Sequence, residues 1–276
     1  CASAGVNTWT AVGPEGGELR KVVLHPTDVD KAVAIAYSGV YRTSNGAVSW
    51  TKSAQQFQNP PYDLLIDPSD PDRLYVFSFS NPHIAVSADG GVTFGPLPSL
   101  PVANPPEPRL GLATVGVMYL GVGLRVFRSD DHGSSWTERK PIVLPAGARI
   151  RWLAVDPTDA NTVYGLAGAD GVPSDLFVSR DGAATWARRS RAVTSLVPHP
   201  TVAGELWSAQ QDGLWKSQDY AATWTNVGFP TGVYDLALNV RGGDLDIVTS
   251  TVAGVFRSVD GGSQWSEIAG DLRWNL

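Results

Sequence analysis

The sequence predicts an all-β protein, and more specifically a single six-bladed β-propeller of four-stranded blades. Two observations lead to this prediction. A turn-like motif recurs six times, with successive copies 38 to 50 residues apart, and short apolar segments flank each copy at similar offsets. The chain also contains 29 glycines and 20 prolines, whereas charged residues make up only 17% of it. Four short strands repeated every ~40–50 residues are typical of a propeller blade. Seven blades is the less favoured alternative.

The repeated motif reads Ser/Thr-x-Asp/Asn-x-Gly/Ala-x-Ser/Thr-Trp/Phe. Its acidic or amide side chain can accept backbone N–H groups within a tight turn, and the small residues that follow tolerate positive φ. The final aromatic ring can pack beneath the turn, where its burial contributes ~2–3 kcal/mol. We therefore expect six structural turns that each tie two strands together. Their central residues are Asn45, Asp89, Asp131, Asp181, Asp219 and Asp260.

Three apolar segments precede each motif, and we expect them to form the first three strands of a blade. They are short, rich in β-branched residues and bounded by glycine or proline, which favours strands over helices. The fourth strand begins at the aromatic residue of the motif. The expected first strands are 22–25, 64–67, 110–113, 153–156, 196–199 and 236–239. The second are 32–36, 74–77, 117–120, 162–165, 205–208 and 245–248, and the third are 39–42, 83–86, 125–128, 175–178, 213–216 and 254–257.

The chain is expected to consist of an N-terminal tether, residues 1–6, followed by the propeller, residues 7–276. Residues 7–10 and 271–276 compete for the role of the strand that closes the ring, and the choice stays open. Cys1 is the single cysteine, so an intramolecular disulfide is excluded. Small residues follow it, an arrangement that resembles the mature end of a bacterial lipoprotein. We therefore expect lipidation at Cys1 and a periplasmic, cell-surface or secreted location, with an unmodified thiol as the alternative.

Charge and histidine spacing bear on partners and cofactors. The net charge is −6 and no run is rich in Lys or Arg, so a nucleic-acid partner is not expected. The four histidines show no spacing typical of metal ligands, and no phosphate loop or dinucleotide fingerprint occurs. We expect no metal, no cofactor, no apolar segment long enough to span a membrane, and a monomer.

A ligand site is predicted where the innermost strands begin, at the mouth of the propeller channel. Counting back from the end of each first strand brings polar and aromatic residues to positions where a strand packed between blades should be apolar. This alignment puts Arg109 of the third blade at the position of Arg20, Tyr62, Arg151 and Tyr234. Arginine can bind carboxylate or sulfate, and aromatic rings can stack on sugars. The alternative is a set of solvated strand starts held by ion pairs such as Arg20 with Asp63. The candidate residues are Arg20, Tyr62, Asp63, Arg109, Arg151, Trp152, Tyr234 and Asp235.

The six motifs resemble Asp-box repeats, also called BNR repeats. Such repeats occur in sialidases, sortilin-type receptors, xyloglucan-cleaving tandem propellers and the photosystem II assembly factor. The resemblance covers nearly the whole chain and implies a propeller whose boxes lie at the periphery, away from the usual active site. It therefore implies a structural rather than catalytic role for Asp131.

The resemblance also raises two enzymatic alternatives. A sialidase needs three arginines, and Arg20, Arg109 and Arg151 could supply them, but the Arg-Ile-Pro motif of that family is absent at residues 19–22. Residues 9–17 resemble the start of xyloglucanases, yet no carboxylate occupies residues 36–38, where that family places a catalytic Asp. We expect an exported, non-enzymatic binding or assembly propeller that recognises a protein, peptide or glycan. A glycoside hydrolase of sialidase-like or xyloglucanase-like type is the alternative.

Overall fold

The protein is all-β, as predicted. A computed structural model describes residues 14, 18–55, 57–80, 83–103, 105, 107–113, 116–171, 173–193, 195–210, 212–229 and 232–269. These residues contain 24 β-strands and no helix. The strands form six four-stranded antiparallel sheets, each following chain order, and these are the six blades of a β-propeller. Cys1, the tether 1–6 and both candidate closing strands, 7–10 and 271–276, lie outside the described residues.

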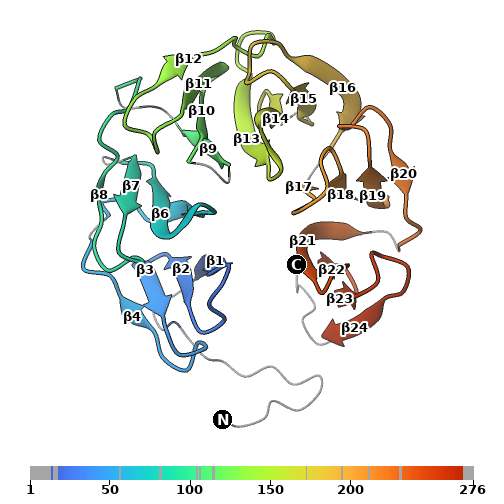
Figure 1. Ribbon diagram of the computed structural model, residues 1–276, viewed down its shortest axis with the longest axis horizontal. Helices are drawn as coiled ribbons and strands as arrows, with labels where there is room; N and C mark the ends of the chain where they lie inside the picture. The colour runs from blue at the N-terminus through green and yellow to red at the C-terminus, as the bar shows by residue number, and fades with distance from the viewer. Residues whose placement is uncertain are drawn as a thin grey trace. The chain divides into compact units, whose positions relative to one another are not determined.

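The chain divides into two compact units with three blades each (Figure 1). The described residues of Ala11–Val143 form the N-terminal unit with blades 1 to 3, and those of Leu144–Leu276 form the C-terminal unit with blades 4 to 6. Blade 1 comprises β1 (Leu19–Leu24), β2 (Ala32–Ala36), β3 (Gly39–Thr43) and β4 (Thr51–Lys52). Blade 2 comprises β5 (Pro61–Asp67), β6 (Asp70–Ser78), β7 (Ile84–Ser87) and β8 (Gly95–Pro96). Blade 3 comprises β9 (Arg109–Leu112), β10 (Met118–Val122), β11 (Arg125–Ser129) and β12 (Thr137–Glu138).

The C-terminal unit repeats this arrangement with longer strands in two of its blades. Blade 4 comprises β13 (Arg149–Asp156), β14 (Asp159–Gly168), β15 (Asp175–Ser179) and β16 (Ala187–Ala192). Blade 5 comprises β17 (Ser195–Pro198), β18 (Leu206–Gln210), β19 (Gly213–Ser217) and β20 (Thr225–Asn226). Blade 6 comprises β21 (Val233–Arg241), β22 (Asp244–Thr251), β23 (Gly254–Ser258) and β24 (Ser266–Ala269).

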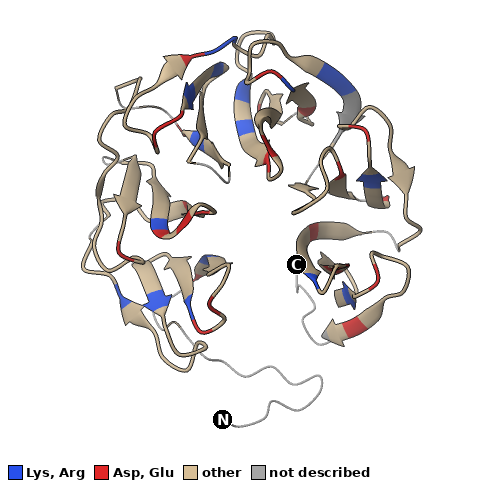
Figure 2. Cartoon of the chain, in the orientation of Figure 1, with Lys and Arg blue, Asp and Glu red and all other residues tan. Residues whose placement is uncertain are grey.

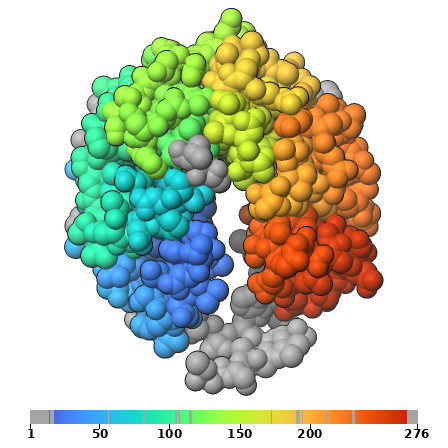
Figure 3. Space-filling view, viewed as in Figure 1, coloured from blue at the N-terminus to red at the C-terminus, as the bar shows by residue number. Residues whose placement is uncertain are grey.

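Neighbouring blades within each unit pack against each other through apolar side chains. Figure 3 shows consecutive stretches of the chain side by side within each unit. The second strand of a blade is its most buried part, and Ile35 of β2 and Phe77 of β6 are fully inaccessible to solvent. Ile35 joins a cluster with Leu64 and Leu74 of blade 2, so this core lies between blades. The first strands β1 and β5, β13 and β17, and β17 and β21 also contact each other, so side chains of these neighbouring blades meet across the blade boundary.

The predicted turn chemistry is observed at Asp131. One carboxylate oxygen of Asp131 accepts hydrogen bonds from the Ser129 hydroxyl at 2.7 Å and the Ser135 backbone N–H at 2.8 Å. The other oxygen accepts from the Ser135 hydroxyl at 2.7 Å, and the Gly133 N–H donates to the Ser129 hydroxyl at 2.8 Å. We call this unit a repeat turn. The repeat turns span residues 43–50, 87–94, 129–136, 179–186, 217–224 and 258–265.

Each repeat turn is hydrogen-bonded to the turn before the second strand of its own blade or to the first residues of that strand. The residue after the central Asp or Asn donates its N–H to a carbonyl there, as His132 does to Gly116 at 3.2 Å. One member of every such pair is glycine. A Cβ at Gly204 would lie only 2.7 Å from Cζ of Tyr220, so the two residues share space for one side chain. The pairs are Asp30–Gly46, Asp72–Gly90, Gly116–His132, Asn161–Gly182, Gly204–Tyr220 and Leu245–Gly261.

These hydrogen bonds define two chemically distinct ends of each blade. The repeat turn and the turn between the first two strands lie at one end, which we call the turn end. The start of the first strand and the loop between the second and third strands lie at the other, the strand-start end; there the Tyr37 N–H donates to the Glu18 carbonyl at 3.0 Å. The central residues of the repeat turns therefore lie at the opposite end of each blade from the predicted ligand-binding residues.

Candidate functional site

Four of the predicted site residues occupy one recurring position, a β-bulge near the start of the first strand. The pairing with the second strand skips a single residue in four blades, and the skipped residue pairs with none. A bulge turns its extra side chain out of the regular alternation of the strand. The skipped residues are Arg20, Tyr62, Arg151 and Tyr234. The predicted Asp63, Trp152 and Asp235 follow directly and resume regular pairing.

The structure corrects the predicted alignment of Arg109. Arg109 pairs with Gly121 of β10, which corresponds to the pairing of Asp63 with Phe77 in blade 2. It therefore belongs with Asp63 rather than with Tyr62. The pairing of β9 with β10 begins at Arg109, so the paired residues of β9 contain no bulge. Leu110, only 5% exposed, consequently takes the core position of Leu64.

In blades 1 and 2 the expected ion pair forms with a different partner. Lys21 Nζ lies 2.6 Å from Oδ1 of Asp63, whereas Arg20 donates to the Pro61 carbonyl at 3.5 Å. The Arg20 guanidinium carbon lies 5.7 Å from the centre of the Tyr37 ring. The bulge explains why Lys21 rather than Arg20 contacts Asp63. It removes Arg20 from the pairing of β1 with β2, whereas Lys21 and Asp63 hold equivalent paired positions in β1 and β5. Arg20 is thus positioned beside an exposed aromatic ring.

Tyr62 connects the first strands of blades 2 and 3. Its hydroxyl donates to the Pro108 carbonyl at 3.1 Å, and the guanidinium carbon of Arg109 lies 5.2 Å from its ring centre. Burial raises the pKa of Tyr62 to about 12, so the phenol is neutral at physiological pH. The Tyr62 ring also packs against Phe79, with 4.5 Å between ring centres. Tyr62 therefore supports Phe79, and Phe79 is 52% exposed.

The candidates of the C-terminal unit form two groups. Arg151 and Arg149 donate to opposite oxygens of Asp170 at 2.8 and 2.9 Å, and these hydrogen bonds, Arg151 first, lower the pKa of Asp170. The two arginines produce the basic bands on β13 (Figure 2). Trp152 is half-buried and packs on the core between blades 4 and 5. Asp235 accepts from the Ser195 hydroxyl at 2.8 Å and so links the first strands of blades 5 and 6.

Exposed aromatic side chains mark the strand-start end. Among the described residues, every aromatic side chain with large exposure lies at this end of its blade: Tyr37 at 62%, Phe79 at 52% and Tyr234 at 46%. Tyr37 and Phe79 were not predicted, because each follows the second strand rather than starting the first. The signal was available, since an aromatic residue directly after the apolar second strand recurs in blades 1 and 2. The turn end exposes aliphatic residues instead, including Val29 and Val48.

The carboxylates at the strand-start end are held by nearby hydrogen-bond donors. A glycosidase needs a carboxylic acid with a raised pKa opposite a second carboxyl group. Asp170 has a lowered pKa, while Asp63 is bound by Lys21 and Asp235 by Ser195. The described residues contain no group of three or more His, Cys, Asp or Glu suited to a metal ion. They also contain no helix long and apolar enough to cross a membrane.

No protein-family model matches this chain. Among curated proteins, a xyloglucanase from Paenibacillus sp is 25% identical over 95% of this chain and 32% of its own length. Xyloglucanase Xgh74A from Acetivibrio thermocellus is 24% identical over 93% of this chain and 39% of its own length. An oligoxyloglucan-reducing end-specific xyloglucanase from Emericella nidulans is 29% identical over 62% of this chain and 24% of its own length. The chain therefore spans about a third of the length of these relatives.

Solved structures confirm the predicted resemblance at the level of the fold. The GH74 enzyme of Niastella koreensis has a TM-score of 0.70 and 15% identity, covering 91% of this chain and 37% of the enzyme. YCF48 from Cyanidioschyzon merolae has a TM-score of 0.62 and 15% identity, covering 90% of this chain and 84% of that protein. A structure of YCF48 bound to D1 peptide has a TM-score of 0.61 and 14% identity, covering 91% and 85%. At these identities the likeness shows the propeller fold alone.

Proposed function

We propose that this chain is a non-catalytic binding propeller that holds a carbohydrate chain at the strand-start end of its blades. The observation that carries the proposal is the confinement of the exposed aromatic rings, Tyr37, Phe79 and Tyr234, to that end. Aromatic faces pack on the apolar C–H faces of sugar rings, and neighbouring guanidinium groups donate to hydroxyl or carboxylate oxygens. Arg20 beside Tyr37 offers this combination directly.

The sequence relatives support a glycan ligand of a particular kind. All three relatives described above are named for xyloglucan or its oligosaccharides, and two of them align with more than nine-tenths of this chain. We therefore propose xyloglucan-type oligosaccharides as the first ligands to test. Such a ligand places the protein outside the cytoplasm, as a secreted or surface-attached chain. Binding without hydrolysis agrees with the paired state of Asp63 and Asp170.

A peptide is the second candidate ligand. It is favoured by the solved structure of YCF48 with D1 peptide, which this chain resembles over 85% of that protein's length. Peptide carboxylates suit Arg20 and Arg109, and peptide side chains suit the exposed rings. The two candidates share a location and differ in the chemistry that the rings contact, so one set of variants tests both.

The proposal is tested by titrating xyloglucan oligosaccharides and a peptide array against the wild type and three variants. We expect Phe79→Ala to weaken oligosaccharide binding about tenfold, equivalent to ~1.4 kcal/mol. Phe79→Leu keeps an apolar side chain without an aromatic face, and we expect it to lose nearly as much. Val48→Ala, at the turn end, is the matched control and should bind like the wild type. Unchanged binding in both Phe79 variants, or release of reducing ends from xyloglucan, would contradict the proposal.

A further inference from the structure

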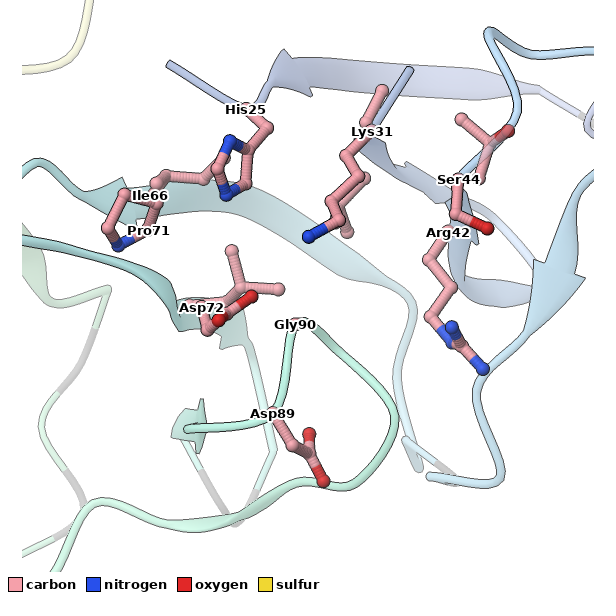
Figure 4. Close-up of a pocket in the computed structure, with 13 residues that line it drawn as sticks. His25, Lys31, Arg42, Ser44, Ile66, Pro71, Asp72, Asp89 and Gly90 are labelled. Carbon is pink, nitrogen blue, oxygen red and sulfur yellow. The ribbon is translucent and has the colours of Figure 1, made fainter. Parts of the chain in front are cut away.

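A second feature of the molecule, unrelated to the strand-start end, is a cavity between blades 1 and 2. It has a volume of about 130 Å³ and lies at the turn end of both blades (Figure 4). Apolar side chains, Val33, Ile66 and Leu74, contribute to its walls. Polar and charged side chains also line it. Blade 1 provides His25, Lys31 and Arg42, and blade 2 provides Asp72 and Asp89.

The cavity is open because of the residue that follows the central Asp of the repeat turn. In blade 3 this residue is His132, whose Nδ1 lies 3.0 Å from Oδ2 of Asp67 at the end of the first strand of blade 2. In blade 5 it is Tyr220, whose ring occupies the corresponding place above Gly204. In blade 2 it is Gly90, which has no side chain to extend toward His25 of blade 1. The space that His132 fills between blades 2 and 3 is therefore left empty between blades 1 and 2.

The positive groups lie on the blade 1 side of the cavity. Lys31 extends between His25 and Asp72 in Figure 4, and its Nζ is 3.5 Å from Asp28, which is its sole ion pair among the described residues. His25 Nδ1 accepts the Asp28 backbone N–H at 3.1 Å, which leaves Nε2 to carry the ring proton. Arg42 has no ion-pair partner within the described part of the chain. These groups leave hydrogen-bond donors available to the cavity.

The negative groups lie on the blade 2 side. Burial is the largest single influence on Asp89 and raises its pKa, but hydrogen bonds from Thr93 and Ser87 together outweigh it and lower the pKa to about 2, so Asp89 is anionic. Those bonds also occupy both of its oxygens. Asp72 forms no ion pair with any described residue. Lys31, Arg42 and Asp72 thus line one cavity, yet neither Arg42 nor Lys31 lies within 4 Å of the Asp72 carboxylate.

We propose that this cavity binds a small zwitterion, an α-amino acid with a short apolar side chain. The ligand carboxylate bonds to Lys31 and Arg42, its ammonium group bonds to Asp72, and its side chain packs on Val33 and Leu74. A simple anion would satisfy the cations but face Asp72, and a simple cation would face Lys31 and Arg42. A ligand that carries both charges satisfies each side, since opposite charges favour one another most where water is partly excluded.

The test is calorimetric titration of the full chain with glycine, alanine and valine, beside propionate and propylamine. We expect alanine or valine to bind at least tenfold more tightly than either singly charged analogue. Failure of all three amino acids to bind the wild type, or equal affinity for propionate, overturns the proposal. This result is independent of glycan binding, so each proposal can fail alone.

Three variants and one control locate the site. Gly90→His copies the plug of blade 3. Its φ of +66° is close to the +54° of His132, and its Cβ would meet Asp72 Oδ1 at 3.3 Å, the end of a side chain that can move. We expect Gly90→His to weaken amino-acid binding at least tenfold, and Asp72→Asn and Arg42→Gln to do the same without filling the cavity. Val48→His, in an exposed repeat turn outside the cavity lining, should leave binding unchanged. If Gly90→His does not fold, full binding by both Asp72→Asn and Arg42→Gln still overturns the proposal.

Discussion

At the scale of single residues, the central Asp of a repeat turn is a carboxylate surrounded by short-range donors. Asp131 accepts three hydrogen bonds from Ser129 and Ser135, and all of them are made within one turn. Such bonds favour the ionised form, and they lower the pKa of Asp131 and of Asp181 to about 2. The turn is therefore stabilised by a charge that the unfolded chain protonates more easily. Asn45 shows that a neutral amide fits the same geometry, since its Oδ1 accepts from Ser49 N–H at 3.0 Å.

This residue-scale account predicts a specific acid sensitivity. The unfolded pKa of Asp is ~3.9, and the folded value is about 2 at Asp131. A depressed folded pKa stabilises the protein above the unfolded value and ceases to do so as pH falls through the folded one. We expect Asp131→Asn to have a lower unfolding temperature than the wild type at pH 5. Between pH 4 and 2 the unfolding temperature of the variant should fall less than that of the wild type. Thermal unfolding measured across this pH range tests the prediction. Asp244→Asn, which changes an exposed carboxylate outside the repeat turns, is the control. Equal pH slopes for Asp131→Asn and the wild type would rule out the account.

At the scale of elements, each blade is fastened by the pairing of one glycine with one larger residue. In blades 3 and 5 the two residues lie so close that only one side chain fits between them. His132 and Tyr220 adopt φ of +54° and +58°, a region that favours glycine, because their partners Gly116 and Gly204 provide the space. His132 fills the cleft to blade 2, whereas the cleft beside Gly90, between blades 1 and 2, is open.

The pairing predicts a compensating double substitution. Gly204→Ala places a Cβ 2.7 Å from the Tyr220 ring at a φ of +70°, and we expect it to lower the free energy of unfolding by ~2–4 kcal/mol. Adding Tyr220→Gly should recover ~1–2 kcal/mol, a coupling measured by a double-mutant cycle in denaturant. Gly123→Ala has a φ of +60° and open space around its Cβ, so it measures the backbone cost alone. Additive effects of the two substitutions would show that the pair does not share space.

Much of this architecture was predictable from the sequence, because the same pattern of residues recurs in every blade. The six turns and the order of strands follow from local chemistry that recurs at Asp131 and its equivalents. The misplacement of Arg109 has a different origin, since the register of β9 against β10 is visible only in the pairing between the strands and not along one of them. Phe79 was missed because its exposure depends on Tyr62 beneath it, a contact between separate strands. The cavity beside Gly90 likewise depends on two blades meeting.

At the scale of the whole molecule, the two ends of each blade carry different kinds of residues. The turn end carries the hydrogen bonds that hold each blade together, and its exposed apolar residues are aliphatic. The strand-start end carries the bulges, several arginines and, among the described residues, every aromatic side chain that is largely exposed. A fold that places structural chemistry at one end leaves the other free to vary, which suits a binding protein. The central claim is that ligand binding occurs there and without bond cleavage.

A crystal structure of the chain soaked with a xyloglucan oligosaccharide tests that claim most directly. The account predicts density for an intact oligosaccharide in contact with at least one of Tyr37, Phe79 and Tyr234, with a sugar ring parallel to the aromatic face. Density for the sugar against the repeat turns, or for shortened products beside Asp63 or Asp235, would contradict it.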